Sequence, residues 1–152
     1  MKPERRSARI LWILLTIFII LMLLFIWGNS LLPAEISSKI SSFVTRLLGK
    51  NAVELHVRKA GHFTEFLLLG GALGLYVTLK RMKGKEKAML LALFALFVPL
   101  MDETIQMFND RSPQVRDIWI DVAGYTCGCL TVLLIVAIAN RFLRNRNGKK
   151  QR

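Results

Sequence analysis

Side chains able to carry out acid–base chemistry are concentrated in residues 101–128. Half of the ten acidic residues of the chain lie in this stretch, and strongly apolar runs flank it at 88–101 and 122–139. An acidic side chain at membrane depth costs up to about 3 kcal/mol, so such groups rarely occur there without a partner or a function. This stretch is therefore the first candidate for a functional site.

Polar residues of three apolar segments fall on one helical face each, at 100° per residue. We expect the three faces to turn toward one another at a single membrane depth. The candidates for acid–base catalysis are His62, Asp102, Glu103 and Asp121. The candidates for binding a ligand are Lys59, Glu65, Gln106, Arg111 and Asp117.

Each candidate also has a purely structural interpretation. His62 is satisfied as a hydrogen-bonded residue between helices, and Asp117 is favoured near a helix start by the helix dipole. Glu65 can pair with Arg58 two turns away. The adjacent carboxylates of Asp102 and Glu103 repel each other and lose hydration, which favours a function for that pair.

Small residues recur at four-residue intervals on two of the segments. This small-xxx-small spacing lets a neighbouring helix approach closely, within one chain or between two copies. The candidate packing positions are Gly70, Gly74, Gly124 and Gly128.

The elements that would position these groups are four apolar segments, predicted at about 10–27, 63–79, 88–107 and 118–139. The third must continue past residue 101, because 88–101 alone would measure only about 21 Å against a hydrocarbon core of about 30 Å. The composition is 53% hydrophobic, and the apolar residues are gathered into blocks. The sequence therefore predicts an all-α membrane protein, a single domain over 1–152 with a four-helix transmembrane bundle.

A fifth helix is predicted at 34–48, between the first two spans. Its apolar residues fall on one face and its serines and basic residues lie away from that face, as in an amphipathic helix. Two interpretations stay open: the helix lies in the membrane surface, or it caps the bundle through protein contacts.

Fifteen of the twenty-two basic residues lie in the N-terminal tail, the loop at 80–87 and the C-terminal tail. The positive-inside rule then places both termini in the cytoplasm and the polar site on the outward side. The net charge of +12 is placed at the ends of apolar segments, so it indicates anionic lipid rather than nucleic acid as the partner.

The two cysteines, Cys127 and Cys129, point to different sides of a helix and cannot pair with each other. The spacing of acids, histidines and cysteines matches no recognised metal motif, so no metal ligands are assigned. The identity of any cofactor stays open.

Two motifs resemble the VanZ-like family of bacterial membrane proteins. The first comprises Lys59, His62, Phe63, Glu65 and Phe66. The second comprises Asp102, Glu103, Gln106, Arg111, Asp117, Asp121, Gly124 and Gly128. The chain departs from the family pattern at Phe66, where the family tends to have Tyr, and at Asn109-Asp110, where it tends to have Pro-Gly. The resemblance implies a bacterial cell-membrane protein, and the founding member is associated with resistance to the glycopeptide antibiotic teicoplanin.

Three functions fit these residues. In the first, the site acts on a lipid or cell-wall-precursor headgroup, with Asp102 or Glu103 as general base and His62 as its acid–base partner; Lys59 and Arg111 would hold a phosphate or carboxylate. In the second, the same pocket binds lipid or antibiotic without turnover. In the third, acids of the site form the proton relay of a small transporter.

Overall fold

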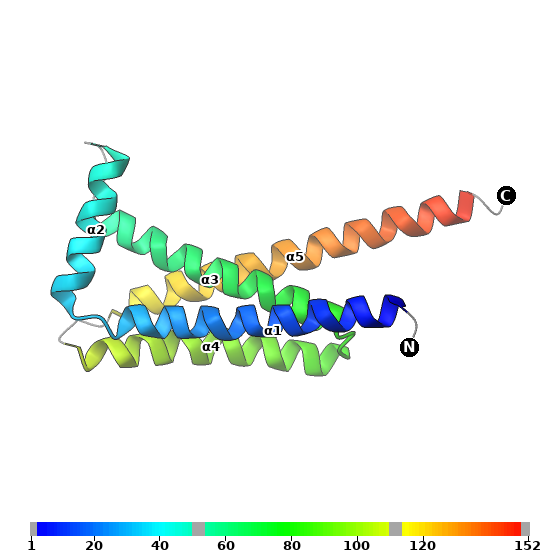
Figure 1. The fold of residues 1–152 in the computed structure, drawn as a ribbon, viewed down its shortest axis with the longest axis horizontal. Helices are drawn as coiled ribbons and strands as arrows, with labels where there is room; N and C mark the ends of the chain where they lie inside the picture. The colour runs from blue at the N-terminus through cyan, green and yellow to red at the C-terminus, as the bar shows by residue number, and fades with distance from the viewer. Residues whose placement is uncertain (1–2, 50–53, 110–113, 150–152) are drawn as a thin grey trace.

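The computed structural model describes residues 3–49, 54–109 and 114–149, and every regular element within them is an α-helix. The helices are α1 Pro3–Ser30, α2 Ala34–Leu48, α3 Glu54–Leu79, α4 Gly84–Met107 and α5 Val115–Lys149 (Figure 1). All except α2 contain a segment that is long and apolar enough to cross a membrane. The prediction of an all-α protein with four apolar spans is therefore confirmed.

The helices extend further than the predicted spans. α3 begins at Glu54 rather than near residue 63, and α5 continues to Lys149, well past residue 139. The physical reason is that an apolar run marks the part of a helix that lipid can surround. Backbone hydrogen bonding continues into the polar ends, where water or other protein groups surround the side chains.

Most of the apolar surface of the spans lies on the outside of the helix bundle and not in its core. Only 17% to 39% of the most apolar part of each span is buried within the protein. The buried core is correspondingly small and is centred on Ile26, Phe66, Leu69, Val98 and Tyr125. A soluble bundle would have to cover these exposed leucine, isoleucine and phenylalanine side chains, whereas lipid acyl chains solvate them directly.

The largest helix–helix interface joins α3 and α5, which cross in the middle of the molecule (Figure 1). Their backbones are in contact because glycines lie at the crossing. A Cβ at Gly70 would overlap the backbone of Tyr125, and a Cβ at Gly124 would overlap the carbonyl of Phe63. Gly128 faces Leu67 in the same way, and a Cβ at Gly74 would lie 3.2 Å from the Cys129 carbonyl oxygen. The partner of both glycine pairs is thus within the chain.

α2 runs across one end of the bundle, steeply inclined to α1 and α4, and contacts α3 (Figure 1). It covers the predicted range, 34–48. One of its faces is apolar and exposed, formed by Ile36, Ile40, Phe43 and Leu47. Ser41, on another face, is buried against the protein.

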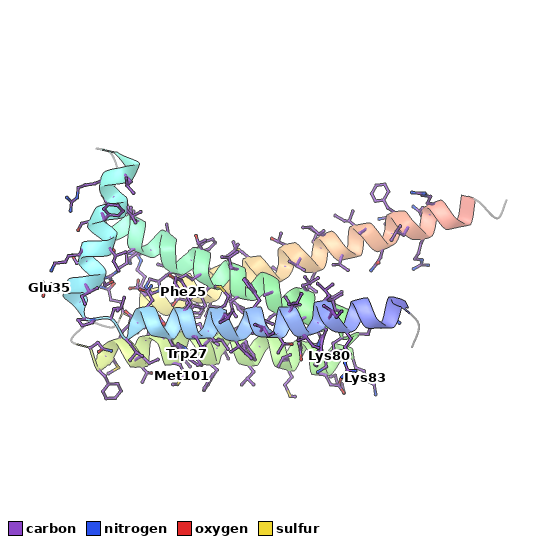
Figure 2. The ribbon with its side chains drawn as sticks, in the orientation of Figure 1. Phe25, Trp27, Glu35, Lys80, Lys83 and Met101 are labelled. Atoms are coloured by element: carbon purple, nitrogen blue, oxygen red, sulfur yellow. The ribbon has the colours of Figure 1, made fainter. Side chains whose placement is uncertain are left out.

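The opposite end of the bundle is basic and aromatic. Lys80 and Lys83 lie there, far from Glu35 on α2 (Figure 2). The Lys80 ammonium donates a hydrogen bond to the Tyr76 hydroxyl at 3.1 Å and lies 4.9 Å from the centroid of the Trp12 ring. Such clusters of aromatic and basic side chains are typical of a membrane–water interface.

Candidate functional site

Three helices bring polar side chains to one depth near the end that α2 crosses. At 1.5 Å per residue, His62 lies about 12 Å from the start of α3, Asp102 about 8 Å from the end of α4, and Asp121 about 9 Å from the start of α5. These helix ends point the same way because α4 is antiparallel to α3 and α5 (Figure 1). The polar faces therefore meet, as the helical periodicity predicted.

His62 occupies the centre of this cluster. Its Nδ1 atom lies 3.8 Å from Oδ2 of Asp102 and 3.8 Å from Oδ1 of Asp121. Both aspartates are completely buried, and the His62 side chain is 15% exposed. One imidazole nitrogen thus faces two carboxylates from two other helices.

Asp102 is held firmly by neutral donors. The Ser30 hydroxyl at the end of α1 donates to its Oδ1 at 2.5 Å, and the Gln106 amide donates to its Oδ2 at 2.8 Å. The same amide also reaches the Ser30 hydroxyl at 3.4 Å. This network fixes the position of the Asp102 carboxylate between α1, α3 and α4.

Asp121 has a different environment. Within the part of the chain that the structure describes, neither of its carboxylate oxygens has a hydrogen-bond partner, although the residue is fully buried. A buried carboxylate normally accepts hydrogen bonds, and leaving one without donors costs several kcal/mol. Its contact with His62 at 3.8 Å is longer than a hydrogen bond.

The remaining candidates surround this centre. Lys59 forms an ion pair of 3.0 Å with Asp117, joining α3 to α5, and both side chains are more than four-fifths buried. Glu103 accepts a hydrogen bond of 3.2 Å from the backbone N–H of Gln114. Glu65 accepts one of 3.2 Å from the Asn29 amide on α1. Arg111 lies outside the described residues.

Two residues of α1 take part that the sequence analysis did not single out, Asn29 and Ser30. Both follow directly after the first apolar span, on the side predicted to hold the site. This position in the sequence was the signal that could have identified them as site residues. Their partners lie in α3 and α4, too far along the chain for helical spacing to connect them.

A cavity of about 580 Å³ opens beside the cluster, between α1, α2 and α3. Its size is that of pockets that hold small ligands. Apolar side chains form one part of its lining, among them Leu24, Phe25, Ile40, Val44 and Val57. The polar part includes Asn29, Ser37, Ser41, Arg58, His62 and Glu65. His62 therefore belongs both to the buried cluster and to the wall of the cavity.

This arrangement suits proton transfer to or from a molecule in the cavity. An imidazole can accept and return a proton, and adjacent carboxylates stabilise its charged form. Asp102 and Asp121 lie next to His62, whereas Glu103 faces the start of α5.

The family model described as VanZ/LLP1 matches residues 10–137 of the chain. This range contains every residue of the cluster and of the cavity lining described above. Comparison with curated proteins and with solved structures gives no match.

Proposed function

Since this chain belongs to the VanZ/LLP1 family, we propose that it binds a membrane lipid, or a lipid-linked precursor of the cell envelope, in the cavity between α1, α2 and α3. The observation that supports this most directly is the double position of His62. It lines a cavity whose wall is partly apolar, as a bound lipid chain would require, while its imidazole faces two buried carboxylates. A molecule with an apolar chain and a polar headgroup matches both parts.

The cavity lining suggests how such an amphiphile is oriented. Leu24, Phe25 and Val44 would pack against an acyl or prenyl chain. Arg58 and His62 would hold a phosphate or carboxylate of the headgroup, because both can donate charge-assisted hydrogen bonds to it. The headgroup would then lie next to the buried acids.

Chemistry on the headgroup is the second part of the proposal. His62 would act as the general acid–base group, with Asp102 orienting it. Binding without turnover is the alternative. Either activity, modifying or shielding an envelope precursor, would account for a role in resistance to teicoplanin-type antibiotics.

We also propose that the cavity opens on the extracytoplasmic side of the membrane, and that both termini lie in the cytoplasm. α2 would then lie in the extracytoplasmic surface of the same membrane. The basic loop around Lys83 and the exposed apolar face of α2 support this placement. In a background whose two cysteines are replaced by alanine, Asn109→Cys should react with an impermeant thiol reagent added to intact cells, and Lys83→Cys should not. The reverse pattern would show that the topology is inverted.

Filling the cavity tests lipid binding. Gly61 lines it, and a Cβ there meets nothing within 4 Å, so Gly61→Leu should place its side chain in the cavity without strain. Gly84→Leu is the matched control, because Gly84 is equally open but lies at the other end of the bundle. Native mass spectrometry of the purified proteins should show a lipid retained by the wild type and by Gly84→Leu, and lost from Gly61→Leu. Equal retention by both variants would refute the proposed cavity.

Turnover is tested separately, by analysing the lipids of cells that express the wild type, His62→Ala or Asp102→Asn. A lipid species that changes with the wild type and reverts in both variants would support chemistry. An unchanged lipid profile, together with lipid retention by the purified wild type, would support binding alone.

A further inference from the structure

We propose that His62, Asp102 and Asp121 bind one divalent transition-metal ion, Zn²⁺ or Mn²⁺. The three residues come from α3, α4 and α5, and the sequence spacing gave no sign of such a site. The inference uses only their geometry and chemistry, and it stands independently of the proposed lipid binding.

The distances suit a metal ion. One ligand atom from each residue, an imidazole nitrogen or a carboxylate oxygen, lies within 4.8 Å of the other two. The imidazole nitrogen is 3.8 Å from an oxygen of each aspartate. With metal–ligand bonds of about 2.0–2.2 Å, ligand atoms around one ion are about 3.0–4.2 Å apart. Two of the separations already fall in this range, and the third needs a contraction of about 1 Å or less.

Asp121 provides the second, independent observation. It is fully buried, its Oδ1 faces His62, and neither oxygen has a hydrogen-bond donor within the described part of the chain. A carboxylate in that state requires a proton or a cation. A metal ion held between the three side chains would supply the missing charge at the place where the oxygens point.

The surroundings of Asp102 resemble those of a metal ligand that outer residues orient. Hydrogen bonds from Ser30 and Gln106 fix its two oxygens. Such bonds to ligating carboxylates are usual around metal sites, where they set the direction of the ligand.

The charges of the side chains near the cluster also favour the binding of a cation. Further ionisable residues lie around it in the described part of the chain: Glu65, Glu103, Asp117, Lys59 and Arg58. Lys59 is engaged by Asp117, and Arg58 lines the cavity. Among the described residues, the five carboxylates in and around the cluster therefore outnumber Lys59, Arg58 and His62, even when His62 is protonated.

The donor set indicates which ions fit. One imidazole nitrogen with two carboxylates suits Zn²⁺ or Mn²⁺, whereas Mg²⁺ and Ca²⁺ favour all-oxygen sites. Three protein ligands leave at least one coordination position for water or for an oxygen of a bound molecule. If the proposed lipid binding holds, this position would face the headgroup, because His62 lines the cavity.

The test uses the full chain, purified in detergent and stripped of metal with a chelator. Titration with Zn²⁺ alone, and separately with Mn²⁺, should give one bound equivalent for at least one of the two ions, measured by calorimetry and elemental analysis. Asp121→Asn and His62→Gln should each weaken the binding at least 100-fold. Glu35→Gln is the matched control: it also replaces a carboxylate by an amide, at an exposed position of α2 outside the three ligands, and should retain the site.

Thermal unfolding separates loss of the site from loss of the fold. The bound ion should raise the Tm of the wild type and of Glu35→Gln, and leave that of Asp121→Asn unchanged. The proposal is overturned if the wild type binds neither ion stoichiometrically, or if Asp121→Asn binds as the wild type does. Lipid retained by the stripped wild type would show that the proposed function survives such a failure.

Discussion

Gly128 lies at one of the two closest backbone contacts between α3 and α5, and alanine substitutions at glycines with different amounts of space are expected to change stability by graded amounts. In Gly128→Ala the new Cβ would overlap the carbonyl of Leu67 and lie 2.7 Å from the backbone nitrogen of Gly71. Because backbone atoms cannot rotate away as a side chain can, the two helices must separate. Overpacking of this kind costs typically about 1–3 kcal/mol. The higher helix propensity of alanine returns about 0.5–1 kcal/mol, so we expect a net loss of about 1–2 kcal/mol.

Three glycines of α3 complete the series of alanine substitutions. At Gly74 the nearest atom to a new Cβ is the Cys129 carbonyl oxygen at 3.2 Å, so a shift of a few tenths of an ångström suffices and we expect a loss below about 1 kcal/mol. At Gly71 the nearest atom is 3.7 Å away, and at Gly61 nothing lies within 4 Å. Alanine at Gly61 should raise stability by about 0.5 kcal/mol through helix propensity alone.

The assay is reversible unfolding in mixed detergent micelles titrated with sodium dodecyl sulfate and followed by circular dichroism. The free energies of unfolding should rank Gly128→Ala lowest, then Gly74→Ala, then the wild type, with Gly61→Ala highest. If Gly128→Ala and Gly61→Ala change stability equally, close approach of α3 and α5 is not what holds the bundle together, and the reasoning fails.

Two further predictions concern polar contacts between helices. Ser30→Ala removes one of the donors to the buried Asp102 carboxylate and should lower the free energy of unfolding by about 1.5–3 kcal/mol. Thr64→Ala loses only an exposed hydrogen bond to its own helix and should change the free energy of unfolding by less than about 0.5 kcal/mol. Equal effects of the two substitutions would contradict the assigned network. A double-mutant cycle with Lys59→Met and Asp117→Asn should give a coupling energy of about 1 kcal/mol or more, because the pair is largely buried, and additive single effects would show that the ion pair contributes no stability.

The convergence of the polar groups could be predicted because it rests on local geometry. His62, Asp102 and Asp121 each lie within about one and a half turns of an end of a predicted apolar segment, at the start of the second, the end of the third and the start of the fourth. Antiparallel spans of similar length then place them at one depth, whatever the details of packing. The glycine spacing likewise marked the faces of α3 and α5 that approach each other.

The individual partners could not be predicted in the same way. Glu65 lies at a spacing that suits Arg58 on its own helix, yet it accepts a hydrogen bond from Asn29 of α1. Asp102 and Glu103 are neighbours in the chain, but one faces Ser30 and the other the start of α5. Consecutive residues of a helix are rotated by 100°, so their side chains face different neighbouring helices. The positions of those helices decide which groups each side chain contacts.

The sequence by itself determined the four apolar spans, the amphipathic helix at 34–48 and the polar faces of three of the spans, because these depend on composition and on a fixed helical period. The tertiary structure alone decided the 3.8 Å distances around His62, the absence of donors to Asp121 among the described residues, and the cavity beside them. Those features depend on how far one helix is rotated and displaced against the next. That is set by contacts such as the glycine crossing of α3 and α5, between residues remote in the chain.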